Sequence, residues 1–196
     1  MAPVLAAAAV LVLSQRPPEL VNPQGPAAYA AWLRGQALAL DARLLRQSAV
    51  CADASVREDA PMSFETMPDP PKGPGGAMAL EHLTLDGCGH HWRLNFAIGR
   101  SPDGGWSSQD LLPGASRAGA LLQTDVLTKL MPFIRQQAPT CADPDWGEAS
   151  VEREPDNKGT WVEIWPIGAC GQDVTMEVTF TPTANGGTDF SAIRLQ

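Results

Sequence analysis

Basic residues are scarce in this chain. Its 196 residues include 14 Lys and Arg against 22 Asp and Glu, which gives a net charge of −8. An acidic surface repels phosphate backbones and anionic headgroups. The electrostatic interaction that supplies most non-specific nucleic-acid binding is therefore repulsive for this chain. We therefore expect no nucleic-acid partner.

Motifs of the common enzyme classes are also missing. The sequence contains no GxSxG, no GxxxxGK[ST] and no GxGxxG pattern. The first is typical of hydrolases with a serine nucleophile, and the others of phosphate and dinucleotide binding. The absence of these motifs therefore favours a protein that is not an enzyme.

A hydrophobic run long enough to span a bilayer is absent as well. Residues 2–13 form an apolar run of 12 residues, which has the length of a signal-peptide core. Cleavage before Gln15 places a signal peptide at 1–14 and a Pro-rich linker at 15–25. No Lys or Arg precedes the run, and a buried N-terminal helix is the alternative. We expect a secreted or periplasmic protein without a transmembrane span after cleavage.

The four cysteines are an even number, which suits two disulfides in an oxidising compartment. They form neither a CxxC pair nor a zinc-ribbon spacing. Pairing rules alone leave three connectivities, and four reduced cysteines in a cytosolic protein remain the alternative.

An internal duplication of the sequence favours one of the three cysteine connectivities. Residues 46–53 and 135–143 both read Arg, Gln, x, Ala, and then Cys, Ala, Asp, with one inserted residue in the second copy. An offset of 82 residues then maps Glu81 onto Glu163 and the Cys-Gly pair at 88–89 onto that at 170–171. The pattern predicts two copies of one unit, at 26–114 and 115–196.

Each predicted unit contains two cysteines, so the economical pairing joins Cys51 to Cys88 and Cys141 to Cys170. We predict an α+β fold made of two tandem copies of a helix followed by an antiparallel β-meander, each closed by its own disulfide. A small unit has a thin core, and closing such a loop stabilises it by about 3 to 4 kcal/mol in the chain-entropy model.

Apolar residues at steps of three and four predict a helix over 27–47 in the first unit and over 116–137 in the second. Ser116 is placed to cap the second helix. Pro132 lies inside that helix, where we expect a kink or break.

Alternation of apolar and polar residues along 92–98 and 174–180, together with the tight turns beside these segments, predicts the strands that follow. In the first unit they cover 79–85 and the segment from Trp92 to Ile98, and in the second 160–167, 174–180 and 188–195. A further strand is expected after each first cysteine, near 62–66 and 148–152.

The three histidines are candidate metal ligands. They lie within ten residues of one another at 82, 90 and 91. Neighbouring strands would bring His82 near His90 or His91, and imidazoles so arranged bind zinc or copper. Adjacent histidines point to opposite faces of a sheet, so one of the pair at most joins His82. Surface histidines without a metal are the ordinary alternative.

Two other sets of residues are candidate ligand contacts. Glu81 and Glu163 occupy matching strand positions and would form paired carboxylates for acid–base chemistry if the units brought them together, whereas exposed strand glutamates are commoner. Trp92, Trp161 and Trp165 are candidates to line a groove for sugars or peptides, whereas filling a small core is the commoner role.

These observations favour a secreted or periplasmic, non-enzymatic binding or envelope-associated protein with a ligand site between its two units. One alternative is a periplasmic metal-dependent hydrolase that uses the histidines or the glutamates. Another is an accessory subunit of an envelope complex. The identity of the ligand or partner does not follow from the residues.

Overall fold

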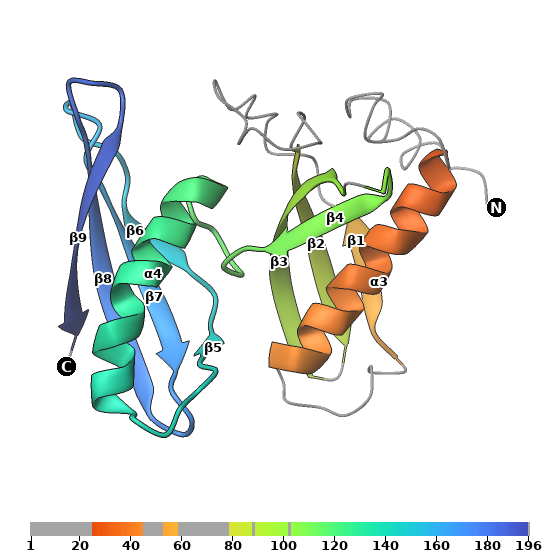
Figure 1. Cartoon of the computed structure of the whole chain (residues 1–196), viewed down its shortest axis with the longest axis horizontal. Helices are drawn as coiled ribbons and strands as arrows, with labels where there is room; N and C mark the ends of the chain where they lie inside the picture. The colour runs from red at the N-terminus through yellow and green to blue at the C-terminus, as the bar shows by residue number, and fades with distance from the viewer. Residues whose placement is uncertain (1–24, 45–52, 59–78, 88, 102, 196) are drawn as a thin grey trace. The chain divides into compact units, whose positions relative to one another are not determined.

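The computed structural model describes residues 25–44, 53–58, 79–87, 89–101 and 103–195. The chain divides into two compact units, Met1–Leu111 and Leu112–Gln196, and each is described separately below (Figure 1). The predicted signal peptide, the Cys51–Cys88 bridge and the strand near 62–66 lie outside the described residues. Both units combine a helix with an antiparallel sheet, so the predicted α+β class is confirmed.

The first unit packs helix α3 (Pro26–Leu44) against a four-stranded antiparallel sheet in the order β1-β2-β3-β4. Its strands are β1 (Ser55–Glu58), β2 (Ala79–Gly87), β3 (His90–Arg100) and β4 (Trp106–Asp110). This is the helix-on-sheet arrangement that buries one apolar face of each element.

The core of the first unit lies between α3 and the facing side of β2 and β3. Tyr29, Leu33 and Leu40 project from α3 at helical spacing and are buried. They pack with alternate residues of the two strands, including Leu83 and Leu94, in one cluster. The core therefore combines a stripe of period 3.6 on the helix with residues of period 2 on the strands.

The second unit packs helix α4 (Ala120–Gln137) on a five-stranded sheet in the order β5-β7-β8-β9, with β6 also pairing with β7. Its strands are β5 (Asp145–Trp146), β6 (Ser150–Arg153), β7 (Trp161–Gly168), β8 (Asp173–Pro182) and β9 (Thr188–Leu195). Val126, Leu130 and Ile134 of α4 are buried in its core. Among the described residues, no helix is long and apolar enough to cross a membrane.

Two details of α4 differ from the expectations. The helix begins after Gly119, which has no side-chain cap, so the prediction that Ser116 caps it is wrong. Pro132 does not break the helix, which continues to Gln137. Proline has no N–H, so the carbonyl of Thr128, four residues earlier, has no helical donor. Thr128 is exposed, so water can donate to this carbonyl while the buried face of the helix stays packed.

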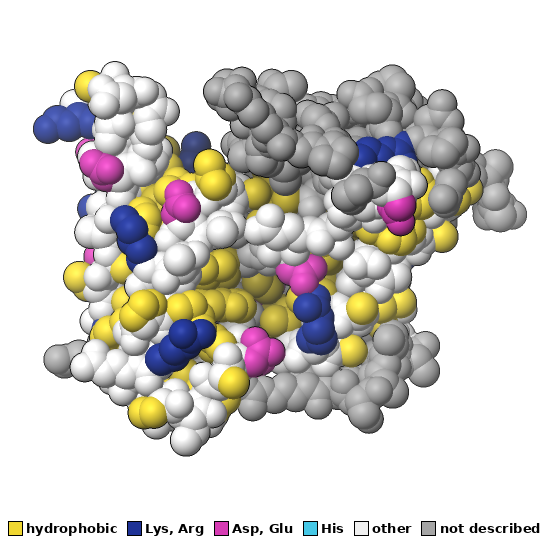
Figure 2. All heavy atoms as spheres, viewed as in Figure 1, with side chains coloured by type: hydrophobic (Ala, Val, Ile, Leu, Met, Phe, Trp, Pro, Cys, Tyr) yellow, Lys and Arg dark blue, Asp and Glu magenta, His cyan; other side chains and the backbone are white. Residues whose placement is uncertain are grey.

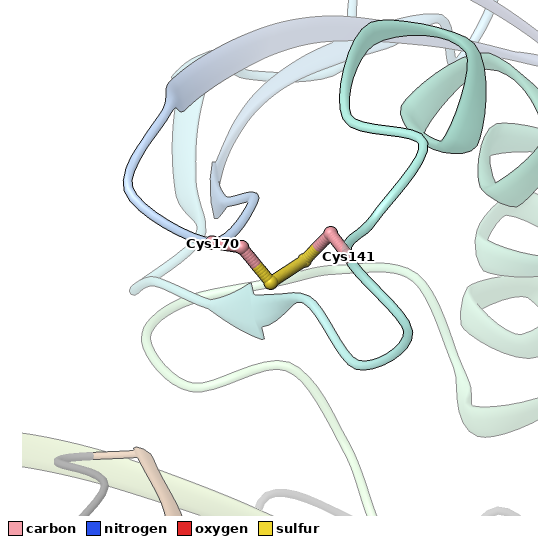
Figure 3. The surroundings of a disulfide bond; sticks show 2 residues. All are labelled: Cys141 and Cys170. Atoms are coloured by element: carbon pink, nitrogen blue, oxygen red, sulfur yellow. A yellow bond between two sulfur atoms is a disulfide. The ribbon is translucent and has the colours of Figure 1, made fainter.

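The predicted bridge between Cys141 and Cys170 is confirmed (Figure 3). Cys141 follows the end of α4, and Cys170 lies in the turn between β7 and β8, with 5.4 Å between the two Cα atoms. The bond therefore joins the exit of the helix to a hairpin turn and closes a loop with a sequence separation of 29.

The registers of the two sheets correspond. Adding 82 to both members of a β2–β3 or β3–β4 pair gives a β7–β8 or β8–β9 pair for every pair from Ala79↔Ile98 to Asp86↔His91 and from Phe96↔Asp110 to Arg100↔Trp106. Thus Glu81 faces Phe96 in the first sheet, and Glu163 faces Val178 in the second.

Candidate functional site

Glu163 is a fully buried carboxylate on the side of β7 that faces α4. Its Oε1 accepts hydrogen bonds from the backbone N–H of Arg117 at 2.7 Å and from Nε1 of Trp161 at 2.8 Å. Its Oε2 accepts from Oγ of Ser116 and from Nε1 of Trp165, both at 2.8 Å. Burying a carboxylate costs several kcal/mol unless it is hydrogen-bonded, and these four donors supply that compensation.

The donors at 116 and 117 belong to the segment that leads into α4. Gly114 forms an isolated parallel bridge with Ala149, the residue before β6, and the N–H of Ala115 donates to the Ala149 carbonyl at 2.8 Å. Gly114 has φ of +88°, and a Cβ there would lie 2.3 Å from the Ala149 oxygen. Glycine is therefore required for the backbone approach that places Ser116 beside Glu163.

Glu81 occupies the matching position of the first sheet and is also buried, with 1% of its surface exposed. The phenol of Tyr29, on α3, donates a hydrogen bond of 2.9 Å to its Oε1. Both glutamates therefore face the helix of their own unit, whereas exposed strand glutamates were the commoner expectation. The reason is parity, because odd-numbered residues of β2 and β7 point towards the helix.

This burial limits the chemistry of both residues. A general acid or base must come within hydrogen-bond reach of its substrate, and neither carboxylate has exposed surface of any size. In each unit the carboxylate is instead an acceptor that fixes neighbouring groups. The placement does not favour the hydrolase alternative for these glutamates.

The predicted tryptophan contacts are largely core residues. Trp165 is fully buried, and its ring lies in the core cluster of the second unit. Trp161 is half-buried and stacks on Phe180 with 4.7 Å between ring centroids. Trp92 is half-buried with its centroid 5.8 Å from that of His90. The indole N–H groups of Trp161 and Trp165 both point to Glu163, so these two rings do not offer their polar atoms to a ligand.

The register separates the two candidate metal ligands. His82 pairs with Asn95 on the face of the sheet away from α3, is buried, and hydrogen-bonds to the Asn95 side chain. His90 lies four residues before the core residue Leu94 on β3, so both point to the face that α3 covers. His90 and His82 are therefore on opposite faces of the sheet. Within the part of the chain that the structure describes, no group of three or more His, Cys, Asp or Glu residues is arranged to hold a metal ion.

His91 shares the face of His82 but is engaged elsewhere. It is exposed and hydrogen-bonds to the carboxylate of Asp86. This hydrogen bond, assisted by Arg57, holds the pKa of Asp86 below its usual value. The histidine cluster of the sequence is therefore distributed over three different environments.

Asp41 is a buried carboxylate that the sequence patterns did not single out. It lies on α3 with 1% of its surface exposed, and among the described residues its Oδ1 has no hydrogen-bond partner. Burial raises the pKa of the Asp41 carboxyl, and the nearby His90 opposes that rise. The only sequence signal was a helical spacing of four from the buried Ala37.

A groove lies between α4 and β9 in the second unit, with a volume of about 590 Å³. Its lining residues are Leu122, Asp125, Thr128, Lys129, Thr188, Asp189 and Phe190. The ammonium of Lys129 sits over the Phe190 ring, 4.6 Å from its centroid. Over the described surface in Figure 2, apolar side chains are interspersed with single charged ones. Sequence reasoning missed this groove because it needs the packing of a helix on an edge strand.

Comparison of this chain with protein-family models, with curated proteins and with solved structures finds no match.

Proposed function

We propose that this chain is an exported, non-enzymatic binding protein, built from two copies of one helix-and-sheet module that are each closed by a disulfide. The observation that carries the proposal is the Cys141–Cys170 bridge. Structural disulfides form and persist in oxidising compartments and are rare in the cytosol, so this bond favours the periplasm or the extracellular space.

The corresponding registers support the duplication. A constant offset of 82 residues relates the three-stranded part of one sheet to that of the other. A shift of one residue in the pairing would turn every side chain of a strand to the other face of the sheet. Two unrelated sheets are therefore not expected to share both the register and the set of positions that face the helix. The buried glutamates at 81 and 163 are part of this shared frame.

The binding role rests on what the modules offer to a partner. The strand glutamates and Trp165 are enclosed within the modules, whereas the second module carries an accessible groove beside an edge strand. Ligand sites are concave and combine apolar side chains with polar groups that fix orientation, and this groove offers Leu122 and Phe190 beside several polar residues.

Production of the full-length chain in a Gram-negative host tests the proposal. We expect the protein in the periplasmic fraction, with a mature N-terminus near Gln15. Non-reducing peptide mapping should find Cys51 joined to Cys88 and Cys141 to Cys170, and native mass spectrometry should detect a retained ligand or partner.

Two results would reject this proposal. The first is recovery of the chain in the cytosol with free thiols, which would remove the argument for export. The second is a peptide that joins Cys51 to Cys141, which would remove the closure of each module by its own bridge.

A further inference from the structure

Strand β9 is an open edge of the second sheet. It lies at the end of the strand order and, within the described residues, pairs only with β8. It spans eight residues, Thr188–Leu195, and contains neither Pro nor Gly. Edge strands of this length present a row of backbone N–H and C=O groups that can pair with another chain, and proteins usually shorten or block them.

The corresponding edge of the first unit is better protected. Strand β4 has five residues, and its terminal Asp110 forms an ion pair with Arg43 of α3. By contrast, Ile193 of β9 is a large apolar residue with 57% of its surface exposed. The longer and more apolar edge is therefore the better candidate for an interaction.

The groove adjoins the first part of this edge, at Thr188, Asp189 and Phe190. Leu122 and Phe190 supply apolar lining from α4 and from β9, respectively. A peptide that added to β9 as a further strand would point alternate side chains to the side of the sheet that α4 covers, and so towards this groove. Backbone pairing would supply affinity, and the groove would select the side chains.

The charge of the second unit indicates which side chains these are. Residues 112–196 contain 11 Asp and Glu against 6 Lys and Arg, a net charge of 6 − 11 = −5. The groove itself has two carboxylates, of Asp125 and Asp189, and one ammonium, of Lys129, which lies over an aromatic ring. This surface attracts a segment that carries basic side chains and repels an acidic one.

We propose that β9 and α4 form a recognition site for an extended, basic segment of a partner protein, which adds to the sheet beside β9 and inserts an apolar side chain between Leu122 and Phe190. This inference gives the proposed binding function a place and a partner chemistry. It rests on the binding part of that proposal and is independent of the duplication.

The probe is a fluorescently labelled peptide of ten residues in which valine alternates with lysine and threonine, added to the full oxidised chain. We expect saturable binding by fluorescence anisotropy at micromolar to millimolar peptide. A peptide with glutamate in place of lysine should bind at least about tenfold more weakly, because both rim carboxylates repel it. Alternate backbone N-methylation of the lysine peptide should abolish binding, since it removes the donors for strand addition.

Protein variants test the location. Thr128→Trp, at an exposed position that lines the groove, should fill the groove and abolish binding. The pair Asp125→Asn and Asp189→Asn should weaken binding by about threefold to tenfold, as expected for two partly exposed charge interactions. Asp173→Asn, an exposed residue at the start of β8, is the matched control and should leave binding unchanged. Circular dichroism and unfolding curves should confirm that each variant folds.

Several results would overturn this inference while leaving export and disulfide formation intact. They are an absence of saturable binding up to millimolar peptide, equal binding of the glutamate or N-methylated peptide, or unchanged binding by Thr128→Trp. Sedimentation showing that two copies of this chain pair through β9, and that Ile193→Lys separates them, would assign the edge to self-association instead.

Discussion

The phenol of Tyr29 donates its hydrogen bond to the buried carboxylate of Glu81, across the interface between α3 and β2. The chain has one tyrosine, and it lies opposite the strand glutamate of the first unit. In the second unit, the matching Glu163 is served by serine, tryptophan and backbone donors instead. Two different sets of donors thus satisfy a carboxylate at the same sheet position.

Removal of the Tyr29 hydroxyl should destabilise the first unit. We expect Tyr29→Phe to lower the free energy of unfolding by about 1 to 3 kcal/mol, because the buried Glu81 loses a hydrogen-bond donor. Urea unfolding measures the effect. A double-mutant cycle with Glu81→Gln isolates the pair, and a coupling energy near zero would contradict the proposed interaction.

Glu163→Gln should have a larger effect. An amide nitrogen in place of one oxygen faces two donors and accepts from neither, so we expect a loss of about 2 to 4 kcal/mol. Hydrogen exchange should show the loss as faster exchange in β7 and in residues 112–119. The matched control is Glu152→Gln, an exposed residue of β6, which should change the unfolding midpoint little.

The Cys141–Cys170 bridge should stabilise the second unit mainly by restricting its unfolded state. For a sequence separation of 29, the chain-entropy model gives about 3 to 4 kcal/mol. The double variant Cys141→Ala, Cys170→Ala should lose an amount of this order and show faster hydrogen exchange in β7 and β8 than the oxidised parent. Equal exchange in the two proteins would mean that the bridge is incidental to stability.

Asp41 should make stability depend on pH. Burial raises the pKa of its carboxyl in the folded state, so the folded chain binds a proton more readily than the unfolded chain does. Its favourable contribution is therefore complete below the unfolded pKa and is lost as pH rises through the raised folded pKa. The facing His90 lies on β3 and reduces this effect.

Asp41→Asn removes this titration. The gain in stability over the parent should be smallest near pH 4 and should grow with pH until Asp41 is fully ionised in the folded parent. Urea midpoints at several pH values measure it, with Asp173→Asn as the exposed control. A difference that stays constant with pH would show that Asp41 does not titrate abnormally.

The extent to which the fold followed from the residues differs between elements. The strands β7, β8 and β9 were predicted within one or two residues. Alternation of apolar and polar residues located β8, and the Gly-containing turns on either side of β8 located its two neighbours. The start of α4 was predicted wrongly, because Ser116 does not cap the helix and instead donates a hydrogen bond to Glu163 on β7. A capping residue and a tertiary donor look the same in a sequence.

The candidate site was harder to predict than the fold. The sequence marked the glutamates at 81 and 163 and the histidine cluster as unusual, and the structure found both glutamates buried and His82 and His90 on opposite faces. It gave no indication of the groove between α4 and β9. Spacing along one strand reports a residue's face, but it does not report which other element covers that face.

The amino-acid sequence by itself determined the acidic charge, the α+β class and the pairing of Cys141 with Cys170, because these depend on composition, local periodicity and order along the chain. Only the tertiary structure decided which carboxylates are buried and satisfied, and which sheet edge stays open beside a groove. Those properties arise where a helix packs on a sheet. They depend on contacts between residues that lie tens of positions apart in the chain, and no local sequence pattern specifies such contacts.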